Sequence, residues 1–393
     1  MRPMVGQRRN VMSHQLTAAQ LLKFELLDKG LTVSQEALSS LAVANRERSL
    51  SPRDYASTSG VVLKLEDDVW VNAPVDVYNP NFVSATPYEL GYDDGFYVEG
   101  NGLTSRAAFW LQPKYHGTEN QHGPLNRYVF THGDRARLAP VQSCSMTCTF
   151  CNIPYDYPIQ DQYLIKSADA LVLAARTAIT DEWQPAHHVL ISGGTPKPKD
   201  IGWLRETYTH VLTDLHGVQV DLMMVPLPGL FDLPRLAQLG VHEFSINIEL
   251  FNRERAQEFM RQKYRQGLNF YLDFIEQASA EFGRGRVRSM LMVGLEPLED
   301  TLRGVRAIAE RGGTPVLSPF RPDPVTPLAS IPPPESTLLR EAYLRAKDIV
   351  AEYDLELGPD CPPCTHNTLS FGTGPREQLV YRHEQPVMAG DKM

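Results

Sequence analysis

The stretch CSMTCTFC, residues 144–151, places three cysteines in the spacing C-x3-C-x2-C. Iron–sulfur cubanes usually take four cysteine ligands, so a compact triplet without a nearby fourth cysteine can hold three irons and leave the fourth open. An open iron is a position at which a substrate or cofactor can bind. Cys144, Cys148 and Cys151 are therefore the predicted metal ligands and the predicted reaction centre.

Structural zinc is the competing interpretation of these cysteines. Zinc sites usually combine two pairs of close ligands into a tetrahedron, and residues 144–151 supply only one such half. Cys361 and Cys364 offer a second half. Spacing alone therefore leaves open a non-catalytic protein whose five cysteines are structural.

Composition narrows the class of protein. The 393 residues are 42% hydrophobic and 22% charged, which is ordinary for a soluble globular protein with one barrel-sized domain and an accessory region. The net charge of −9, without a long block of Lys or Arg, argues against nucleic acid as a partner.

The cysteine spacings do not form a secreted disulfide framework, so we expect a cytoplasmic protein. No apolar stretch reaches about 18 residues, so no membrane span is expected, and residues 1–15 lack the apolar run of a signal peptide.

The pattern after residue 137 alternates short apolar runs with amphipathic helical stretches. Such alternation is typical of parallel βαβ units whose strands are buried on both faces. It predicts an α/β fold: a partial (β/α)6 TIM-type barrel over residues 138–330, after an N-terminal α+β accessory region (1–137) and before a C-terminal helix and extension (331–393). The expected strands are 138–142, 188–192, 218–225, 243–250, 287–293 and 315–319, and the expected helices are 168–180, 200–215, 232–239, 253–282, 298–311 and 335–353.

The accessory region carries its own local signals. Thr17 and Gln20 have the spacing of a capping box before a helix that should end at Gly30. A second helix is expected over 34–44, and residues 61–75 alternate like a β-hairpin. We expect this region to wrap or cap the active site.

The cysteine spacing, with the aromatic Phe150 just before the last cysteine, resembles the radical S-adenosylmethionine (SAM) superfamily. The order of later motifs resembles its biotin-synthase-like members. The resemblance implies a [4Fe-4S] cluster on Cys144, Cys148 and Cys151, with SAM bound at the open iron and cleaved to a 5′-deoxyadenosyl radical. It further implies a small-molecule substrate and a flavodoxin- or ferredoxin-type electron donor.

Loops at the carboxyl ends of barrel strands carry the chemistry of such folds. Residues 192–196 (SGGTP) resemble the superfamily's glycine motif for the methionyl ammonium group, since glycines let backbone carbonyls approach a ligand closely. Strand alternation puts Asn247 and Glu249 on one face. The resemblance implies that the residues contacting SAM are Phe150, Asn152, Gly193, Gly194, Thr195, Asn247, Glu249, Gly294 and Leu295, with Lys263, Arg265 and Arg288 as the candidate cations for its carboxylate. Arg321 and Asp323, at the end of the sixth strand, are the candidate substrate contacts.

The sequence CPPCTH, residues 361–366, places Cys361, Cys364 and His366 close together. Three interpretations stay open: an auxiliary iron–sulfur cluster, a redox or thiol-donating pair, and a structural zinc site with an outside ligand. An auxiliary cluster would suit a sulfur-inserting synthase, which is the alternative reaction. His187 and His188 begin a strand at the barrel's stability face, so we expect packing roles for them.

Overall fold

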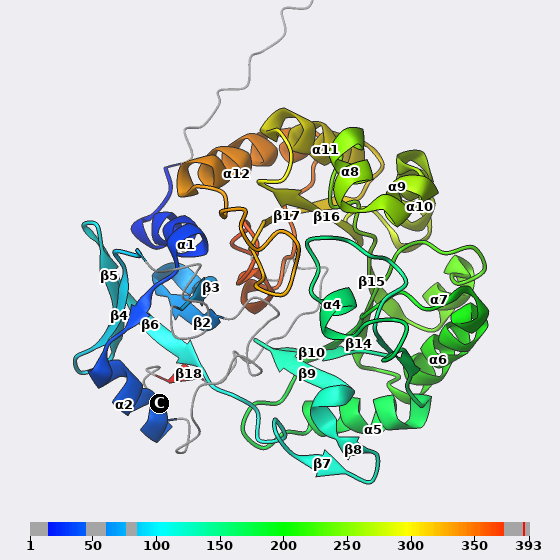
Figure 1. Cartoon of the computed structure of the whole chain (residues 1–393), viewed down its shortest axis with the longest axis horizontal. Coiled ribbons are helices and arrows are strands. Elements are labelled where there is room, and N and C mark those ends of the chain that lie inside the picture. Colours follow the sequence, from blue (N-terminus) through cyan, green and yellow to red (C-terminus); the bar gives the residue numbers. More distant parts are fainter. Residues whose placement is uncertain (1–14, 45–59, 76–84, 373–387, 390–393) are drawn as a thin grey trace, which may run out of the picture.

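The computed structural model describes residues 15–44, 60–75, 85–372 and 388–389. Residues 1–14, most of the segment examined above for a signal peptide, lie outside this part. Two sheets with their covering helices form a ring of elements (Figure 1). In the described part of the chain, no helix is long and apolar enough to cross a membrane.

The first sheet belongs to the accessory region and has the strand order β1-β4-β5-β6-β2-β3, with β18 paired to β6. The capping box is present, because the Gln20 amide donates to Thr17 Oγ1 (3.3 Å) and the Thr17 amide to Gln20 Oε1 (3.1 Å). The predicted hairpin is also present, as β2 and β3 pair antiparallel around a short turn. The elements are α1 (Ala18–Lys29), β1 (Thr32–Val33), α2 (Gln35–Ala44), β2 (Gly60–Leu65), η2 (Glu66–Asp68), β3 (Val69–Pro74), β4 (Glu89–Tyr92), β5 (Phe96–Gly100), β6 (Leu103–Trp110) and β18 (Met388–Ala389).

The second sheet is the curled sheet of a partial TIM-type barrel, in the order β17-β16-β15-β14-β13-β10-β9. Neighbours from β10 to β17 are parallel, whereas β9 is an additional antiparallel strand. The strands are β9 (Val129–His132), β10 (Arg135–Leu138), β13 (His188–Ile191), β14 (Gln219–Met223), β15 (Val241–Ser245), β16 (Val287–Val293) and β17 (Thr314–Pro319).

The first parallel strand differs from its predicted position. It runs over Arg135–Leu138, so the expected boundary between 137 and 138 falls inside β10. This strand is not a continuous apolar run, because Arg135 and Arg137 alternate with Ala136 and Leu138. The apolar run that is expected to form the strand, 138–142, instead ends in β11 (Val141–Gln142), which pairs with β12 (Leu164–Ile165).

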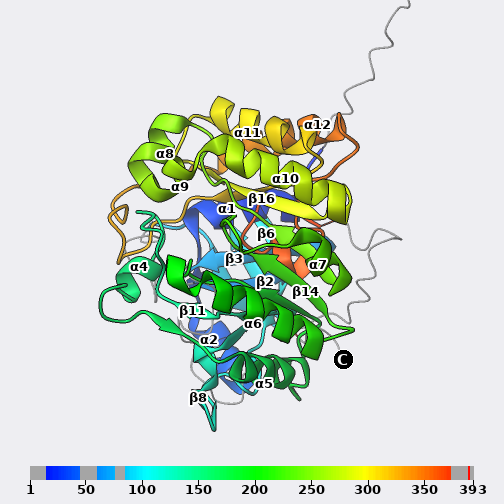
Figure 2. The same cartoon turned by 90° about the vertical axis from the view of Figure 1, so that its right-hand side faces the viewer.

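Helices cover the outside of the barrel sheet (Figure 2). The expected long helix over 253–282 is three helices, because Met260 (φ −145°) and Gly267 (φ 93°) leave the helical conformation. The helices are α4 (Ile153–Asp156), α5 (Ala168–Ile179), α6 (Ile201–Asp214), α7 (Leu233–Gln238), α8 (Arg253–Phe259), α9 (Arg261–Gln266), α10 (Leu268–Phe282), α11 (Leu298–Glu310) and α12 (Ser336–Ala351); the short remaining elements are β7 (Glu119–Asn120), β8 (Gly123–Pro124), η3 (Leu125–Arg127), η4 (Pro198–Asp200) and η5 (Pro362–Thr365).

The accessory sheet and the C-terminal segment close the open side of the barrel. The segment after η5 joins β17 on one side, where the Leu369 amide donates to the Leu317 carbonyl (2.8 Å). On the other side the Asn72 amide of β3 donates to the His366 carbonyl (2.6 Å). The buried Lys23 ammonium of α1 donates to the Thr365 carbonyl (2.9 Å). The N-terminal and C-terminal parts of the chain are thus packed together against the barrel (Figure 1).

Candidate active site

The cysteine triplet lies in the loop that leaves the carboxyl end of β10. Cys148 is buried, and Cys144 and Cys151 are half-buried. Ser143, which precedes the triplet, is fully buried and has a left-handed backbone (φ 71°). A non-glycine residue in this conformation is held there by its surroundings, and such strain is concentrated at functional sites.

The SGGTP motif holds one side of this loop. The Thr195 amide donates to Cys144 Sγ (3.2 Å), and the Ser145 amide donates to the Thr195 carbonyl (2.9 Å). The Ser145 hydroxyl also donates to the Pro196 carbonyl (2.9 Å). Gly194 packs against the loop so closely that a Cβ there would lie 1.6 Å from the Ser143 carbonyl oxygen. Residues that are 51 positions apart in the sequence therefore bring the two predicted cofactor-binding motifs into direct contact.

Helices α8 and α9 hold the other side of the loop. The Thr149 amide donates to the Phe259 carbonyl (2.9 Å). The Gln262 side chain donates through Nε2 to Thr147 Oγ1 (2.6 Å), and its Oε1 accepts from the Thr147 amide (3.4 Å). The triplet is thus fixed between the loop after β13 and the helices after β15. Figure 2 shows α4, α8 and α9 on the same side of the molecule.

A buried ion pair lies next to the triplet. Lys263 Nζ is 2.8 Å from Glu249 Oε2 and 3.2 Å from the Asn247 carbonyl, to which it donates. Asn247 Oδ1 accepts from the Ser245 hydroxyl (3.0 Å) and the Met290 amide (3.2 Å). β15 ends at Ser245, and Glu249 has a left-handed backbone (φ 68°), so strand alternation does not place these residues as predicted. They still converge, because Glu249 bridges to β16 through backbone hydrogen bonds with Met290 and Met292.

Burial and this ion pair both shift the pKa values of Cys148 and Cys151. Burial raises the pKa of Cys151 to about 11. The pKa of Cys148 is raised further, by burial first and then by the Glu249 charge, while Lys263 counteracts the rise. Burial would also lower the pKa of Lys263, but Glu249 reverses this and raises it above its ordinary value. Ionised thiols here require a bound cation, which is what a metal cluster provides.

Removing the lysine tests whether the ion pair supports this site. Lys263→Met would leave the Glu249 carboxylate buried beside Cys148, and breaking a buried pair from one side costs about 3–5 kcal/mol. We expect that loss in the free energy of unfolding, measured by urea denaturation. The double variant Lys263→Met/Glu249→Gln removes both charges and should regain more than half of it. Equal stability of the single variant and the wild type would contradict this account.

Two of the three predicted SAM cations are placed elsewhere. Arg265 is exposed on α9. Arg288 lies at the amino end of β16, where its Nη2 is 2.8 Å from both Asp221 Oδ2 and Glu243 Oε2. The sequence could not show this, because a charged residue near a strand gives no sign of which strand end it occupies. Only Lys263 is close to the triplet.

Sequence reasoning missed Arg137, near the carboxyl end of β10. Its Nε donates to the Ser192 hydroxyl (2.7 Å) at the start of the SGGTP motif. Burial lowers the pKa of Arg137, and the charge of a Cys151 thiolate counteracts this. Among the residues that the structure describes, no carboxylate pairs with Arg137. The feature of the sequence that could have indicated Arg137 is its alternation with apolar residues just before the triplet.

The other residues that are predicted to contact SAM lie after β16 and in the loop around the triplet. Gly294 (φ 109°) and the buried Leu295 follow β16, as predicted for a strand-end loop. Phe150 and Asn152 are half-buried, and Asn152 Nδ2 donates to Asp156 Oδ2 (2.8 Å).

The two residues predicted to contact the substrate, Arg321 and Asp323, have different surroundings. Arg321 is buried, and its Nη2 donates to the Asn72 carbonyl (2.7 Å), so it contacts the accessory sheet. Asp323 is half-buried and electrostatically coupled to Asp156 of α4, and burial raises its pKa. Asp323 therefore lies near the loop after the triplet, whereas Arg321 is directed to the interface with the accessory region.

Cys361 and Cys364 do not join the triplet. Cys361 Sγ is 3.4 Å from Asp134 Oδ1, and Cys364 Sγ is 3.4 Å from His188 Nε2. Asp134 and His188 stand at the amino ends of β10 and β13, opposite the triplet. His366 Nδ1 instead donates to the Pro363 carbonyl (2.7 Å). The His188 ring, for which a packing role was expected, is buried and contacts the Cys364 thiol.

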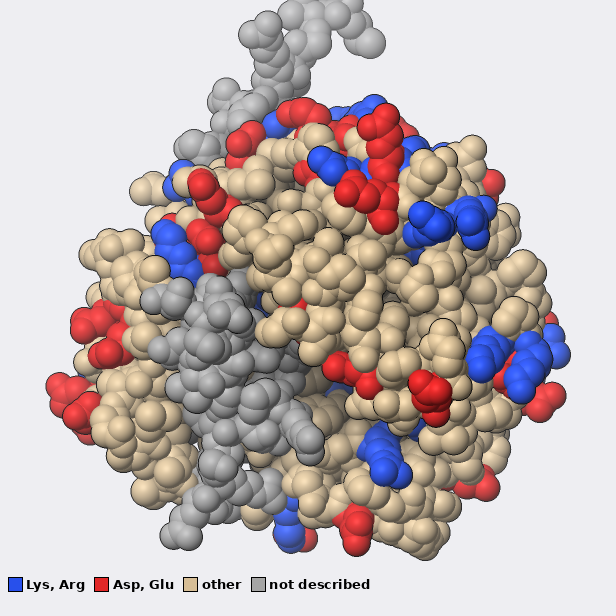
Figure 3. Space-filling model, in the orientation of Figure 1, with Lys and Arg blue, Asp and Glu red and all other residues tan. Residues whose placement is uncertain are grey.

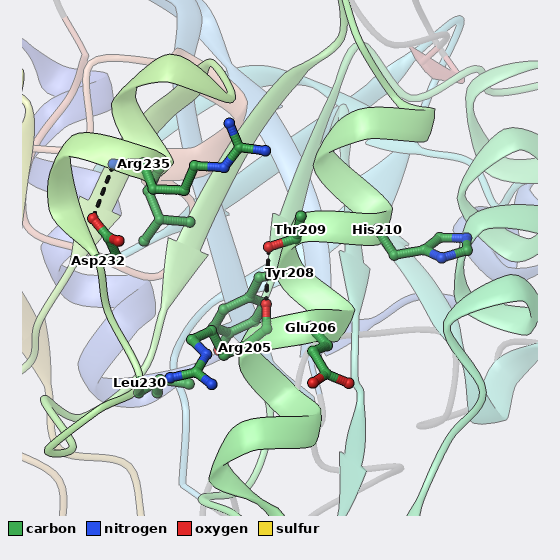
Figure 4. Close-up of a pocket in the computed structure, with 9 residues that line it drawn as sticks. Arg205, Glu206, Tyr208, Thr209, His210, Leu230, Asp232 and Arg235 are labelled. Carbon is green, nitrogen blue, oxygen red and sulfur yellow. Dashed lines mark hydrogen bonds between the residues drawn. The ribbon is translucent and has the colours of Figure 1, made fainter.

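The surface offers a different kind of site away from the cysteines. A hollow of about 480 Å³ lies between α6 and the segment leading into α7, lined by Arg205, Tyr208 and Asp232 among others (Figure 4). None of the predicted site residues lines it. On the face seen in Figure 3, Lys and Arg side chains of the described residues are scattered among Asp and Glu and form no continuous basic surface.

Comparison with known proteins matches residues 138–314 to the family described as the radical SAM superfamily. Over this region the chain is similar to radical SAM enzymes. The bacteriochlorophyllide c C-7(1)-hydroxylase of Chlorobaculum limnaeum is 31% identical over 101 residues. That match covers 24% of this chain, and the chain spans only a quarter (25%) of the hydroxylase.

Solved structures resemble the chain more distantly. The FeFe-hydrogenase maturase HydG from Carboxydothermus hydrogenoformans is 15% identical with a TM-score of 0.42, covering 56% of this chain and 52% of HydG. A radical SAM methyltransferase from Sphaerobacter thermophilus is 13% identical with a TM-score of 0.42, covering 70% of this chain and 76% of that protein.

The cofactors of the superfamily, a [4Fe-4S] cluster and SAM, suit the residues of this site. The three thiols belong to one loop and influence one another electrostatically. The Met146 and Thr195 amides donate to Cys144 Sγ, and hydrogen bonds of this kind to ligand sulfur tune a cluster. A non-catalytic zinc protein, the alternative open from sequence, does not agree with the superfamily match.

Proposed function

We propose that the protein is a biotin-synthase-like radical SAM enzyme that functionalises or rearranges a C–H position of a small molecule. The observation that carries this proposal is the triplet loop itself, fixed at the carboxyl end of a parallel barrel between the SGGTP motif and α8–α9. When bound, the cluster supplies one electron that splits SAM into methionine and a 5′-deoxyadenosyl radical, which abstracts hydrogen from the substrate.

The protein's part is to hold SAM and substrate and to exclude water from the radical. Gly193, with a left-handed backbone (φ 133°), and Gly194 bring the backbone after β13 to the triplet. The segment after β15 adds the polar oxygens of Asn247 and Glu249. Lys263 contacts both residues and holds them in place. These groups suit the ammonium and ribose hydroxyls of SAM.

Arg137 is the cation that we propose for a carboxylate of SAM or substrate, because Lys263 is already paired with Glu249. Arg137→Gln should weaken binding of that carboxylate by about ten- to a hundredfold, the effect of losing a hydrogen bond to a charged group. Titration with SAM and the substrate KM identify which ligand is affected. Arg265→Gln, on the exposed face of α9, is the matched control and should change neither constant. If both constants of Arg137→Gln equal those of the wild type, the arginine has no such role.

The name of the hydroxylase relative is consistent with C–H functionalisation. Its short match does not define the substrate here. We propose a small molecule that fits within the barrel, a flavodoxin- or ferredoxin-type reductant, and a cytoplasmic location in keeping with the free thiols. Sulfur insertion is less well supported, since Cys361 and Cys364 lie at the opposite end of β10 and β13 from the triplet.

Cleavage of SAM by the purified protein tests the proposed function. The protein, purified without oxygen and reduced with dithionite, should convert SAM to 5′-deoxyadenosine and methionine. Incubation with deuterated candidate metabolites should then place deuterium in 5′-deoxyadenosine for the true substrate. A reduced, iron-loaded protein that leaves SAM intact with every candidate would refute the proposal.

A further inference from the structure

Four buried ligand-type side chains converge at the amino ends of β10 and β13. One ligand atom from each of Asp134, His188, Cys361 and Cys364 lies within 4.8 Å of all the others. Each of these residues is at most 5% exposed. They come from the turn before β10, the start of β13 and the segment around η5, so the fold and not a local motif assembles them.

The distances within this group match the edges of a tetrahedron around one ion. Zinc binds sulfur at about 2.3 Å and nitrogen or oxygen at about 2.0–2.2 Å, so tetrahedral ligand atoms stand about 3.3–3.8 Å apart. Cys364 Sγ is 3.4 Å from His188 Nε2 and 3.9 Å from Asp134 Oδ1. Cys361 Sγ is 3.4 Å from Asp134 Oδ1. These contacts span three of the expected ligand–ligand edges.

Charge gives the second argument. The buried Asp134 carboxylate lies 4.0 Å from His187 Nδ1 and 3.8 Å from His188 Nδ1, beside two thiols, and buried groups of this kind are paired or bind a metal. Two thiolates, one carboxylate and a divalent cation sum to a single negative charge. Arg135 follows Asp134 directly, pairs in register with His188 across the two strands, and acts electrostatically on Cys364. Its guanidinium balances that remaining charge.

We propose that Asp134, His188, Cys361 and Cys364 bind a single zinc ion, which displaces the two thiol protons. A cubane cluster is a poorer fit, because it must accommodate four irons and four sulfides between its ligands, whereas these ligand atoms enclose space for one ion. His366, the ligand expected from the sequence, is replaced by His188 and Asp134.

The zinc would fasten the C-terminal segment to the barrel. Residues 361–371 touch β17, β3 and α1 through backbone and lysine hydrogen bonds. Gly133, next to Asp134, has a left-handed backbone (φ 60°) and would place a Cβ 2.9 Å from Pro363 Cβ, so the turn and η5 pack without room between them. The ion therefore sits where the accessory sheet, the barrel and the C-terminal segment meet, about 13 Å along β13 from the SGGTP motif at a rise of about 3.3 Å per residue.

The experiment is metal analysis of the full-length protein, purified without oxygen or chelators from cells supplied with zinc and iron. We expect about one zinc ion and about four irons per chain. Zinc X-ray absorption of the wild type should show two sulfur ligands at about 2.3 Å and two nitrogen or oxygen ligands at about 2.0–2.2 Å. This measurement needs no variant and decides the question even if variants fail to fold. Zinc absent from the wild type would overturn the proposal.

Variants then assign the ligands. Cys364→Ser and His188→Gln should lose most of the zinc, while His366→Gln, whose Nδ1 is already engaged by Pro363, should keep it. A variant lacking the three triplet cysteines should lose iron but retain zinc, so the site is tested separately from the proposed reaction. Iron that exceeds one cubane and disappears in Cys364→Ser would show an auxiliary cluster instead. A Cys361–Cys364 disulfide in the anaerobic protein, seen by mass, would show a redox pair instead.

Discussion

Cys148→Ala is expected to reduce 5′-deoxyadenosine formation to background and to lower the iron content well below four per chain. Cys148 is the most buried cysteine of the triplet, and its neighbours Thr147 and Thr149 are both held by α8 and α9. A cubane with three protein ligands has no spare ligand, and no other cysteine in the described chain is near this end of the barrel. Cys144→Ala and Cys151→Ala should behave in the same way.

The measurements are iron and sulfide per chain, the broad visible absorption of the cluster, and SAM cleavage under dithionite. Cys361→Ala is the matched control, because it removes a buried thiol at the opposite end of the strands and should leave the cubane and SAM cleavage in place. Turnover at the wild-type rate in any triplet variant would refute the assignment of the reaction centre.

Much of the fold could be predicted from local signals. The capping box of α1, the β2–β3 hairpin and most barrel strands follow from patterns a few residues long. β10 could not, since its interior face carries Arg135 and Arg137. The Ser192 hydroxyl that accepts from Arg137 comes from a distant segment, so this contact is a tertiary property. The expected long helix breaks at Met260 and Gly267, and next to the first break the Phe259 carbonyl accepts from the Thr149 amide of the distant triplet loop.

The candidate site also has some features that the sequence predicts and others that it does not. The triplet and the SGGTP motif were found because their chemistry is encoded in short spacings. Contacts between distant segments were not: the Arg288 pairs with Asp221 and Glu243, the approach of His188 to Cys364, and the position of Arg137 beside the triplet. Each depends on which strand end a residue occupies, and a single sequence carries no direct record of strand register.

Gly194 illustrates how the structure changes a prediction. From the sequence, its role is to let backbone groups approach the SAM ammonium, so a larger side chain is expected to weaken SAM binding. In the structure a Cβ at residue 194 would meet backbone atoms of the triplet loop, 1.6 Å from the Ser143 oxygen and 3.0 Å from Cys144 Cα. Backbone atoms cannot rotate away as a flexible side chain can, so the loop itself must move.

Gly194→Ala should therefore impair cluster assembly as well as SAM binding. Movement of the loop would break the bond from the Thr195 amide to Cys144 Sγ and that from the Ser145 amide to the Thr195 carbonyl. Misplacement of reacting groups by about 1 Å can cost about 10²-fold in rate, and we expect a loss of this order in SAM cleavage per chain, together with reduced iron content.

Gly202→Ala is the matched control for this glycine. It lies in the first turn of α6, where a Cβ meets nothing within 4 Å, and alanine is a better helix former than glycine. This control should keep the wild-type iron content and rate and be slightly more stable. If Gly194→Ala instead holds a full cluster and only its SAM dissociation constant rises, the glycine serves ligand approach alone. The contact with the triplet loop would then not govern cluster assembly.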